Sequence, residues 1–291
     1  MAIISATNVA PLISEVWDAE VLQARYAEAT ILNRVLNKSE LVADSGQIIH
    51  ITVVPRFVGG TVGTDGAFTP ETQTLTAINV NVNTWQYVSV DIPIQQSRQS
   101  VADLKKVLPA GFGKRLAERS DIALADLFTS FTGGNVGSAA GPEQFIEDAA
   151  LGAVLQARKR DLPLNELSWF LSPECFYDGW LTKERMTNAN TTGMGKSALI
   201  SNWRGPILNI SAYESNLLDG ASGNQKTNQK YAICGLVHKE ALAYAMQIQN
   251  KYYEASKVPA GFLGDIIVAA SLYGTVIGRA NHGIRIFIKN K

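Results

Sequence analysis

Residues 47–54 are Gln47-Ile48-Ile49-His50-Ile51-Thr52-Val53-Val54, a run in which β-branched residues alternate with polar ones. The alternation returns in Ile78-Asn79-Val80-Asn81-Val82 and in Tyr87-Val88-Ser89-Val90-Asp91-Ile92. Strict alternation over such lengths is typical of β-strands, and the glycine-rich segment 59–66 between the arms indicates a turn. The sequence therefore predicts a long β-ribbon over about residues 47–95, with Trp85 and Tyr87 on its returning arm.

This ribbon is nearly uncharged. Within residues 45–99 the charged side chains are Arg56, Asp65, Glu71, Asp91 and Arg98, and no lysine occurs between Lys38 and Lys105. An isolated two-stranded hairpin is marginally stable in water, and exposed strand edges normally carry lysine or proline. The ribbon could fold onto its own domain or reach over an adjacent subunit, and its low charge favours the second interpretation.

Helices and further strands surround the ribbon. A helix is predicted at about residues 11–30, with Trp17 and Val21 on its apolar face. A short helix from Ser100 is expected to be interrupted by Pro109, and a longer helix to cover about 111–131. Further helices are expected from Pro142 and Pro173, strands at 168–171, 206–213, 230–236, 242–249 and 284–288, and a polar loop at 183–197. Residues 264–279 are apolar and ambiguous between helix and strand.

Composition limits the class of protein. The chain has 291 residues, a formal net charge of zero and 46% hydrophobic residues, which excludes a disordered chain. Charged residues make up 18%, below the roughly 25% of an average soluble domain, so much of the surface is expected to be covered. The sequence contains no run of 18 apolar residues, so no membrane span is predicted. The first residues lack the pattern expected of a secretory signal. The neutral balance argues against wrapping nucleic acid by charge.

No catalytic or cofactor-binding site is predicted. His50, His238 and His282 lie in separate segments, without a second ligand at metal-binding spacing. Cys175 and Cys234 lack a Cys-x-x-Cys pattern and are expected to be buried thiols in a reducing compartment. The segment Gly193-Met194-Gly195-Lys196-Ser197 has Asn190 where a phosphate-binding loop needs its first glycine, and a polar segment precedes it instead of a strand.

The order of the segments resembles the major capsid proteins of tailed double-stranded DNA bacteriophages with the Hong Kong 97 fold, closest to those of podovirus-like phages. The residues that carry this resemblance are Glu15-Val16-Trp17, Leu32-Asn33-Arg34, Gly46-Gln47-Ile48-Ile49-His50-Ile51, Asp121-Ile122-Ala123-Leu124, Trp203-Arg204-Gly205-Pro206, His238-Lys239-Glu240-Ala241, Leu272-Tyr273-Gly274 and Gly283-Ile284-Arg285-Ile286. Each motif is a short pattern and not a catalytic signature, and the resemblance rests on their order over nearly the whole chain.

The resemblance implies an α+β chain of five parts. They are an N-terminal arm at residues 1–45, an extended loop (the β-ribbon) at 46–90, a peripheral domain with a long spine helix at 91–135, an axial domain with a central sheet at 136–250, and a C-terminal segment at 251–291 that returns to the peripheral domain. The loop at about 183–200 would point to the centre of a capsomer.

The implied function is a structural one. The chain would assemble with itself into hexamers and pentamers of an icosahedral phage head, in the host cytoplasm, around packaged double-stranded DNA held by weak non-specific contacts. Scaffolding and portal proteins, and in some heads decoration proteins, would be partners; no membrane, metal or cofactor is expected. The residues expected at subunit interfaces are Trp17, Val21, Arg56, Phe57, Phe68, Trp85, Tyr87, Arg98, Arg115 and Arg119. Lys114, Arg115 and Arg119 alternate with acidic residues, which favours a solvated or intersubunit face over DNA readout.

Two departures from the family modify these expectations. No long helical extension precedes the arm, which implies a separate scaffolding protein, and the ribbon lacks a lysine for the isopeptide bond that cross-links the namesake capsid. Two other functions stay open at this level. One is the shell protein of a bacterial encapsulin-type nanocompartment, which shares the fold; the other is a soluble α/β ligand-binding protein or enzyme that uses the loop at 190–197.

Overall fold

A computed structural model describes residues 30–42, 46–62, 64, 66–67, 70–72, 74–93, 104–180, 206–218, 231–255 and 264–289. Several predicted features therefore lie outside the described residues. They are the N-terminal helix with Trp17 and Val21, the interface candidates Phe68 and Arg98, the cap at Ser100, and the loop at 183–200 with the glycine–lysine motif.

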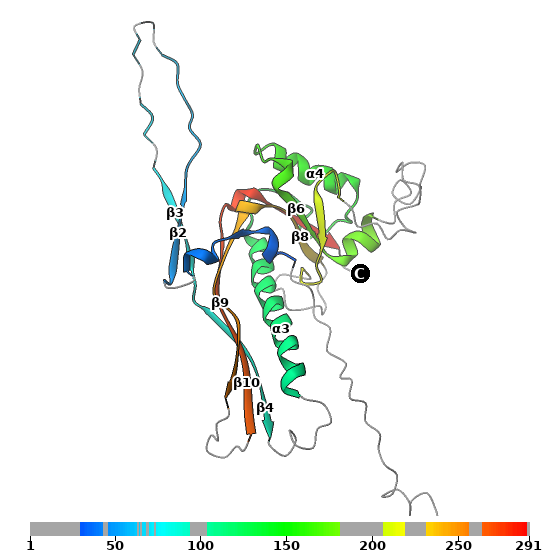
Figure 1. Cartoon of the computed structure of the whole chain (residues 1–291). Helices are drawn as coiled ribbons and strands as arrows, with labels where there is room; N and C mark the ends of the chain where they lie inside the picture. The colour runs from blue at the N-terminus through cyan, green and yellow to red at the C-terminus, as the bar shows by residue number, and fades with distance from the viewer. Residues whose placement is uncertain are drawn as a thin grey trace, which may run out of the picture.

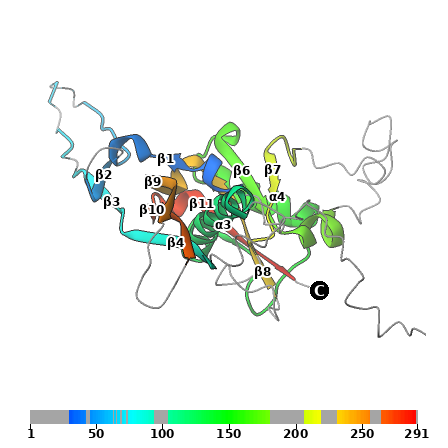
Figure 2. The same ribbon diagram turned by 60° about the horizontal axis from the view of Figure 1, so that its bottom comes forward.

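The described chain forms three β-sheets and two long helices (Figures 1 and 2). A four-stranded sheet has the order β1 (Leu36–Asn37), β9 (Leu242–Ala255), β10 (Gly264–Ile277) and β4 (Thr84–Pro93). A five-stranded sheet has the order β5 (Asn135–Val136), β11 (Gly283–Lys289), β8 (Tyr231–His238), β6 (Leu167–Leu171) and β7 (Ser211–Glu214). The third sheet pairs β2 (Ile48–Val53) with β3 (Thr76–Asn81).

The helices are α3 (Leu104–Asp126) and α4 (Glu147–Arg158). Short 3₁₀ helices are η2 (Leu32–Arg34), η3 (Ser39–Val42), η4 (Leu127–Ser130), η5 (Leu164–Glu166), η8 (Lys239–Ala241) and η9 (Ala280–His282), and η6 (Cys175–Gly179) is a π-helix.

The long helix α3 lies along the four-stranded sheet (Figure 1). Phe112 and Leu116 pack against Ile92 of β4 and Ile267 of β10. The predicted break at Pro109 is wrong, because α3 continues through it. An interior proline costs a helix about 3 kcal/mol, and packing against a sheet can offset that cost where intrinsic helix propensity alone would not.

The five-stranded sheet contains the largest buried cluster. Trp169 of β6, predicted to lie in a buried strand, is fully buried and packs edge-on against Phe145. The alternating isoleucines Ile284, Ile286 and Ile288 of β11 are buried in the same cluster, as their spacing predicts. Ala149, Ala153 and Ala157 form the buried face of α4, which begins at Glu147 and not at Pro142. Small residues here let the helix approach the sheet closely.

The two larger sheets share a second core. Phe128 and Phe131, just beyond α3, contact a group that includes Phe170 of β6 together with Tyr244 of β9 and Tyr273 of β10. The phenyl rings of Phe128 and Phe131 lie 5.1 Å apart, and those of Phe128 and Phe170 lie 5.9 Å apart. The end of α3 therefore joins the part of the chain that carries the ribbon to the part that carries α4.

The predicted ribbon is confirmed for β2 and β3, and the prediction is wrong for residues 84–93. β2 and β3 pair antiparallel from Ile48↔Asn81 to Val53↔Thr76. Residues 84–93, predicted as part of the ribbon, instead form β4 and pair antiparallel with β10 from Thr84↔Tyr273 to Pro93↔Gly264. Residues 264–279, which the sequence left open between helix and strand, form the strand β10 at Gly264–Ile277. Of the strand predicted at 206–213, the structure forms β7 at Ser211–Glu214.

Candidate functional site

The ribbon extends away from both larger sheets (Figure 1). Its base is fixed by a small apolar cluster in which Ile49, Val80 and Val82 pack against Ala243 and Ala245 of β9. The backbone amide of Val82 also donates to the carbonyl of Gln47 at 2.8 Å. These contacts bury one face of β2 and β3 and set the direction in which the arms leave the sheet.

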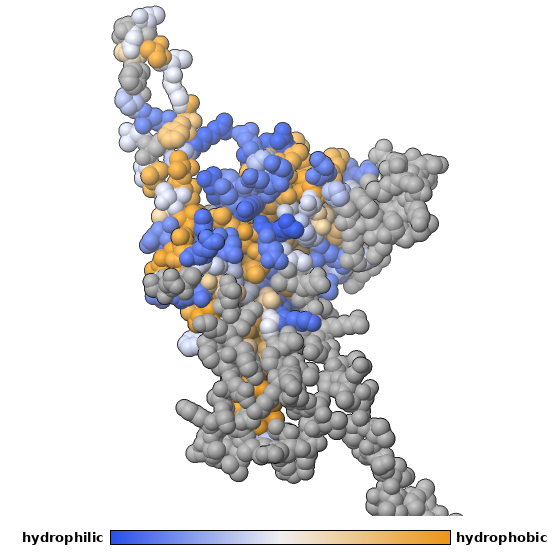
Figure 3. Space-filling view, in the orientation of Figure 1, coloured by the Kyte–Doolittle hydropathy of each residue, from blue (hydrophilic) through white to orange (hydrophobic). Residues whose placement is uncertain are grey.

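Beyond Val53 the two arms run on without ladder pairing and expose apolar side chains. Val58 is 85% exposed and Phe57 is 64% exposed, and Val54, Val62 and Leu75 are also exposed. The carboxylate of Glu71 on the returning arm accepts hydrogen bonds from the backbone amides of Val58 at 3.0 Å and Gly59 at 3.4 Å. Figure 3 shows apolar residues on both arms, beside a strongly polar surface on the neighbouring part of the molecule.

Trp85 and Tyr87, predicted at an interface, lie on β4 and not on the ribbon. Val88, Val90 and Ile92 point toward α3, so Trp85 and Tyr87 lie on the opposite face of the strand. Trp85 is 71% exposed and Tyr87 is 64% exposed. Exposed aromatic side chains of this size are typical anchors of protein–protein contacts.

The predicted arginines have different surroundings. Arg56 lies on the ribbon, and its guanidinium is 3.0 Å from the carboxylate of Asp161 in an exposed ion pair, a kind worth about 0–1 kcal/mol. Arg115 pairs with Glu118 one helical turn along α3. Arg119 is half-buried, and its charge opposes the rise that burial causes in the pKa of Tyr273.

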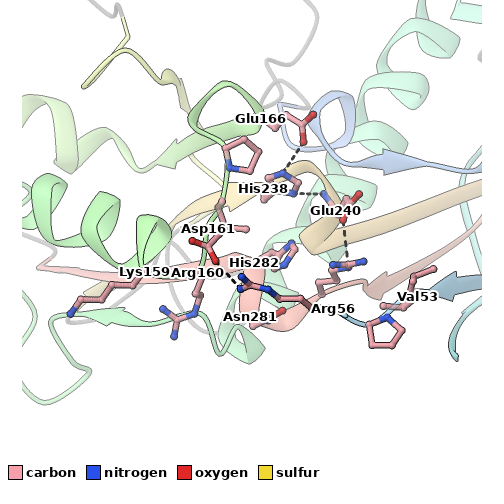
Figure 4. A pocket seen from close by; sticks show the side chains of 15 residues that line it. Val53, Arg56, Lys159, Arg160, Asp161, Glu166, His238, Glu240, Asn281 and His282 are labelled. Atoms are coloured by element: carbon pink, nitrogen blue, oxygen red, sulfur yellow. Dashed lines mark hydrogen bonds and ion pairs between the residues drawn. The ribbon is translucent and has the colours of Figure 1, made fainter. Parts of the chain in front are cut away.

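A hollow of about 870 Å³ opens at the foot of the ribbon (Figure 4). It is lined by the end of β2 with Val54–Arg56, by residues 159–163, and by Glu166, His238, Glu240, Arg279, Asn281 and His282. The ribbon, the turn after α4, the end of β8 and the turn between β10 and β11 thus meet at one place, although they are distant in sequence.

His238 and His282 lie at the centre of this hollow. Their rings are perpendicular, with centroids 5.3 Å apart. His238 is buried, its Nε2 lies 2.8 Å from Oε2 of Glu166, and its Nδ1 accepts a hydrogen bond from the backbone amide of Glu240 at 3.2 Å. Oε2 of Glu240 lies 3.4 Å from Nε of Arg279.

The prediction that the histidines are isolated is therefore wrong for His238 and His282. Burial lowers the pKa of His282, the neighbouring His238 and Arg279 lower it further, and Glu240 opposes the change. The sequence spacing carried no signal for this cluster, because β9 and β10 separate the two histidines along the chain. His50, by contrast, is exposed on β2, with its Nδ1 2.7 Å from Oδ1 of Asn79.

The two cysteines are free thiols in the core of the five-stranded sheet. Both are fully buried, and their Sγ atoms lie 3.4 Å apart. Burial, reinforced by the neighbouring Cys234, raises the pKa of Cys175 well above its ordinary value. A protonated, inaccessible thiol is a poor nucleophile. The expectation that both cysteines are buried thiols is confirmed.

Comparison with solved structures identifies the fold. A chain of Mycobacterium phage Che8 superimposes with a TM-score of 0.75 at 21% identity, covering 94% of this chain and 96% of that chain. The capsid of the cyanophage P-SCSP1u gives 0.76 at 14% identity, covering 100% and 97%. The acidic-stable capsid of Helicobacter pylori bacteriophage KHP30 gives 0.75 at 12% identity, covering 99% of each chain.

No protein-family model and no curated protein sequence matches this chain. Among the described helices, none is both long and apolar enough to cross a membrane. The structural likeness covers nearly the full length of each chain. The chain therefore has the α+β Hong Kong 97-like fold of phage capsid proteins.

Proposed function

We propose that this chain is the major capsid protein of a tailed double-stranded DNA bacteriophage. Copies of it would assemble into hexamers and pentamers of an icosahedral head. In this role the protein acts through contacts between copies and not through catalysis, and its place is the virion.

The observation that carries the proposal is the extended ribbon. Its arms expose Phe57, Val58, Val62 and Leu75 to water. Burying one large apolar side chain is worth about 1.5–3 kcal/mol, so a ribbon laid on a neighbouring copy would supply a substantial part of a subunit contact. In a closed shell every copy both gives and receives such a contact, so many modest interfaces add to a stable lattice.

The partners follow from this role. A separate scaffolding protein would guide assembly, a portal protein would occupy one vertex, and decoration proteins could add to the outer surface. Packaged DNA would touch the inner wall through weak, non-specific contacts, which a chain of zero net charge allows.

Particle formation tests the proposal. The chain, expressed alone and with its scaffolding protein, is expected to sediment on a sucrose gradient as large particles that negative-stain images show as closed shells. A chain that stays monomeric under both conditions and binds nucleotides would contradict the proposal. Shells that enclose an enzyme instead of DNA when isolated from their source would assign the chain to a nanocompartment.

A matched pair of variants sharpens this test. Trp85→Ala removes an exposed aromatic side chain that is expected to contact another copy, and it should lower particle yield while the subunit stays folded. Lys196→Ala removes the side chain that a phosphate site would need most, and particle yield should be unchanged. Normal particle yield from Trp85→Ala, together with loss of a nucleotide-dependent activity in Lys196→Ala, would favour a nucleotide-dependent enzyme.

A further inference from the structure

Three residues in the hollow at the foot of the ribbon can act together as ligands. His238 at the end of β8, Glu240 in η8 and His282 in η9 each place one donor atom so that the three atoms lie within 4.8 Å of one another. Figure 4 shows His238 and Glu240, which come from one short stretch of the chain, beside His282 from another. Two imidazoles with a carboxylate form a donor set that proteins use for Zn²⁺.

The contacts of His238 fix which of its nitrogens can bind an ion. Its Nε2 lies 2.8 Å from Oε2 of Glu166, close but without the angle of a hydrogen bond. Two lone pairs at that distance would repel, so the ring proton lies on Nε2. The lone pair is then on Nδ1, which accepts a hydrogen bond from the backbone amide of Glu240. A carboxylate that holds the far nitrogen of a histidine is the usual outer support of a metal-binding imidazole.

His282 supplies a second donor that the protein leaves unsatisfied. Its Nδ1 is buried and has no hydrogen-bond partner among the described residues. A buried polar atom without a partner destabilises the folded state, and a bound cation would remove that penalty. The perpendicular arrangement of the two rings lets both approach one point without stacking.

The contacts that compete with an ion are weak. The amide of Glu240 reaches Nδ1 of His238 at 3.2 Å, near the long end of the normal range. The Arg279–Glu240 pair, at 3.4 Å, is partly exposed on both sides, and such pairs contribute little. Glu240 can therefore exchange Arg279 for a cation at low cost.

We propose that His238, Glu240 and His282 bind one divalent transition-metal ion, with Zn²⁺ the best fit, and that Glu166 orients His238 for it. Two nitrogen ligands favour Zn²⁺ over Mg²⁺ or Ca²⁺, which prefer oxygen ligands. The ion would tie the end of β8 to the turn between β10 and β11, beside the point where the ribbon leaves the subunit. The fourth ligand is a water molecule, because the hollow is open to solvent.

Metal binding by the full-length protein tests this proposal. Protein freed of metal with a chelator is titrated with Zn²⁺ in competition with a chromophoric chelator, and with Co²⁺ to record the absorption of a tetrahedral site. One ion per chain is expected, together with a rise in Tm on adding Zn²⁺. Glu166→Gln should weaken Zn²⁺ binding roughly 10–100-fold, because Glu166 orients His238 but does not itself bind the ion.

Two further variants and one control separate the site from incidental binding. His282→Ala and Glu240→Gln should each abolish the Co²⁺ spectrum and the Zn²⁺-dependent rise in Tm, whereas His50→Ala should leave both unchanged because His50 lies on β2, outside the cluster. If His282→Ala does not fold, Glu240→Gln alone decides. Equal binding by Glu240→Gln and the native chain would overturn the proposal. So would a thiolate charge-transfer band, which would place the ion at Cys175 and Cys234.

Discussion

Oδ2 of Asp121 in the long helix α3 lies 2.6 Å from the backbone amide nitrogen of Thr30, at the start of the described chain. The same carboxylate accepts hydrogen bonds from Ile31 at 3.0 Å and from Leu32 at 2.8 Å. Asp121 is buried, and burial raises the pKa of its carboxyl group although the three amides oppose the change. One side chain of the helix therefore satisfies three consecutive backbone donors of the segment that leads into the ribbon.

Asp121→Asn should destabilise the subunit by about 1–3 kcal/mol, because the amide group turns a donor toward one of the three backbone N–H groups and leaves it unpaired. Thermal or denaturant unfolding of the subunit measures this loss. Asp148→Asn is the control, since Asp148 is exposed in the first turn of α4 and should cost less than about 1 kcal/mol. Equal losses in the two variants would show that the Asp121 contacts contribute nothing.

The exposed apolar residues of the ribbon should matter for assembly and not for folding. Phe57→Ser and Val58→Ser are expected to change subunit stability by less than about 0.5 kcal/mol, because both side chains are largely in water. They should nevertheless lower particle yield on a sucrose gradient. The comparison is Leu155→Ser, which is the same kind of change at an exposed residue on α4. A ribbon variant that assembles as well as native protein would argue against the ribbon as a contact.

Mature particles should contain no covalent link through the ribbon. An isopeptide bond needs a lysine amine, and none lies between Lys38 and Lys105. Denaturing electrophoresis is therefore expected to give a single band near 31.5 kDa. A ladder of multimers that survives boiling and reductant would place a donor lysine elsewhere in the chain.

Cys175 and Cys234 should be unreactive in the folded protein. Both thiols are fully buried, and the raised pKa of Cys175 keeps it protonated at pH 8. A thiol reagent such as dithionitrobenzoate should label neither in native protein and both in denaturant. Stoichiometric labelling of native protein would mean that the core of the five-stranded sheet opens readily.

Local sequence patterns predicted the strands and helices whose type does not depend on which distant segment they pack against. The alternation in residues 47–54, 78–82 and 284–288 predicted the strands β2, β3 and β11, and the alanine spacing predicted the buried face of α4. The resemblance to phage capsid proteins, carried by the order of short motifs, predicted the overall fold that the structural comparisons support.

Features that depend on distant contacts could not be predicted in the same way. β4 alternates as regularly as β3, and only its pairing with β10 shows that it belongs to a different sheet. Pro109 signals a helix break, and the packing that lets α3 continue comes from strands far along the chain. His238 and His282 meet because β9 and β10 form a long hairpin that returns the chain to its starting point.

A three-dimensional reconstruction of the assembled particles would show whether the ribbon joins neighbouring copies. We expect a closed shell in which residues 54–75 of each copy lie on a neighbouring copy and in which Phe57 and Val58 become buried there. A ribbon folded against its own subunit in the shell, or a purified protein that forms no shell with or without its scaffolding protein, would contradict it.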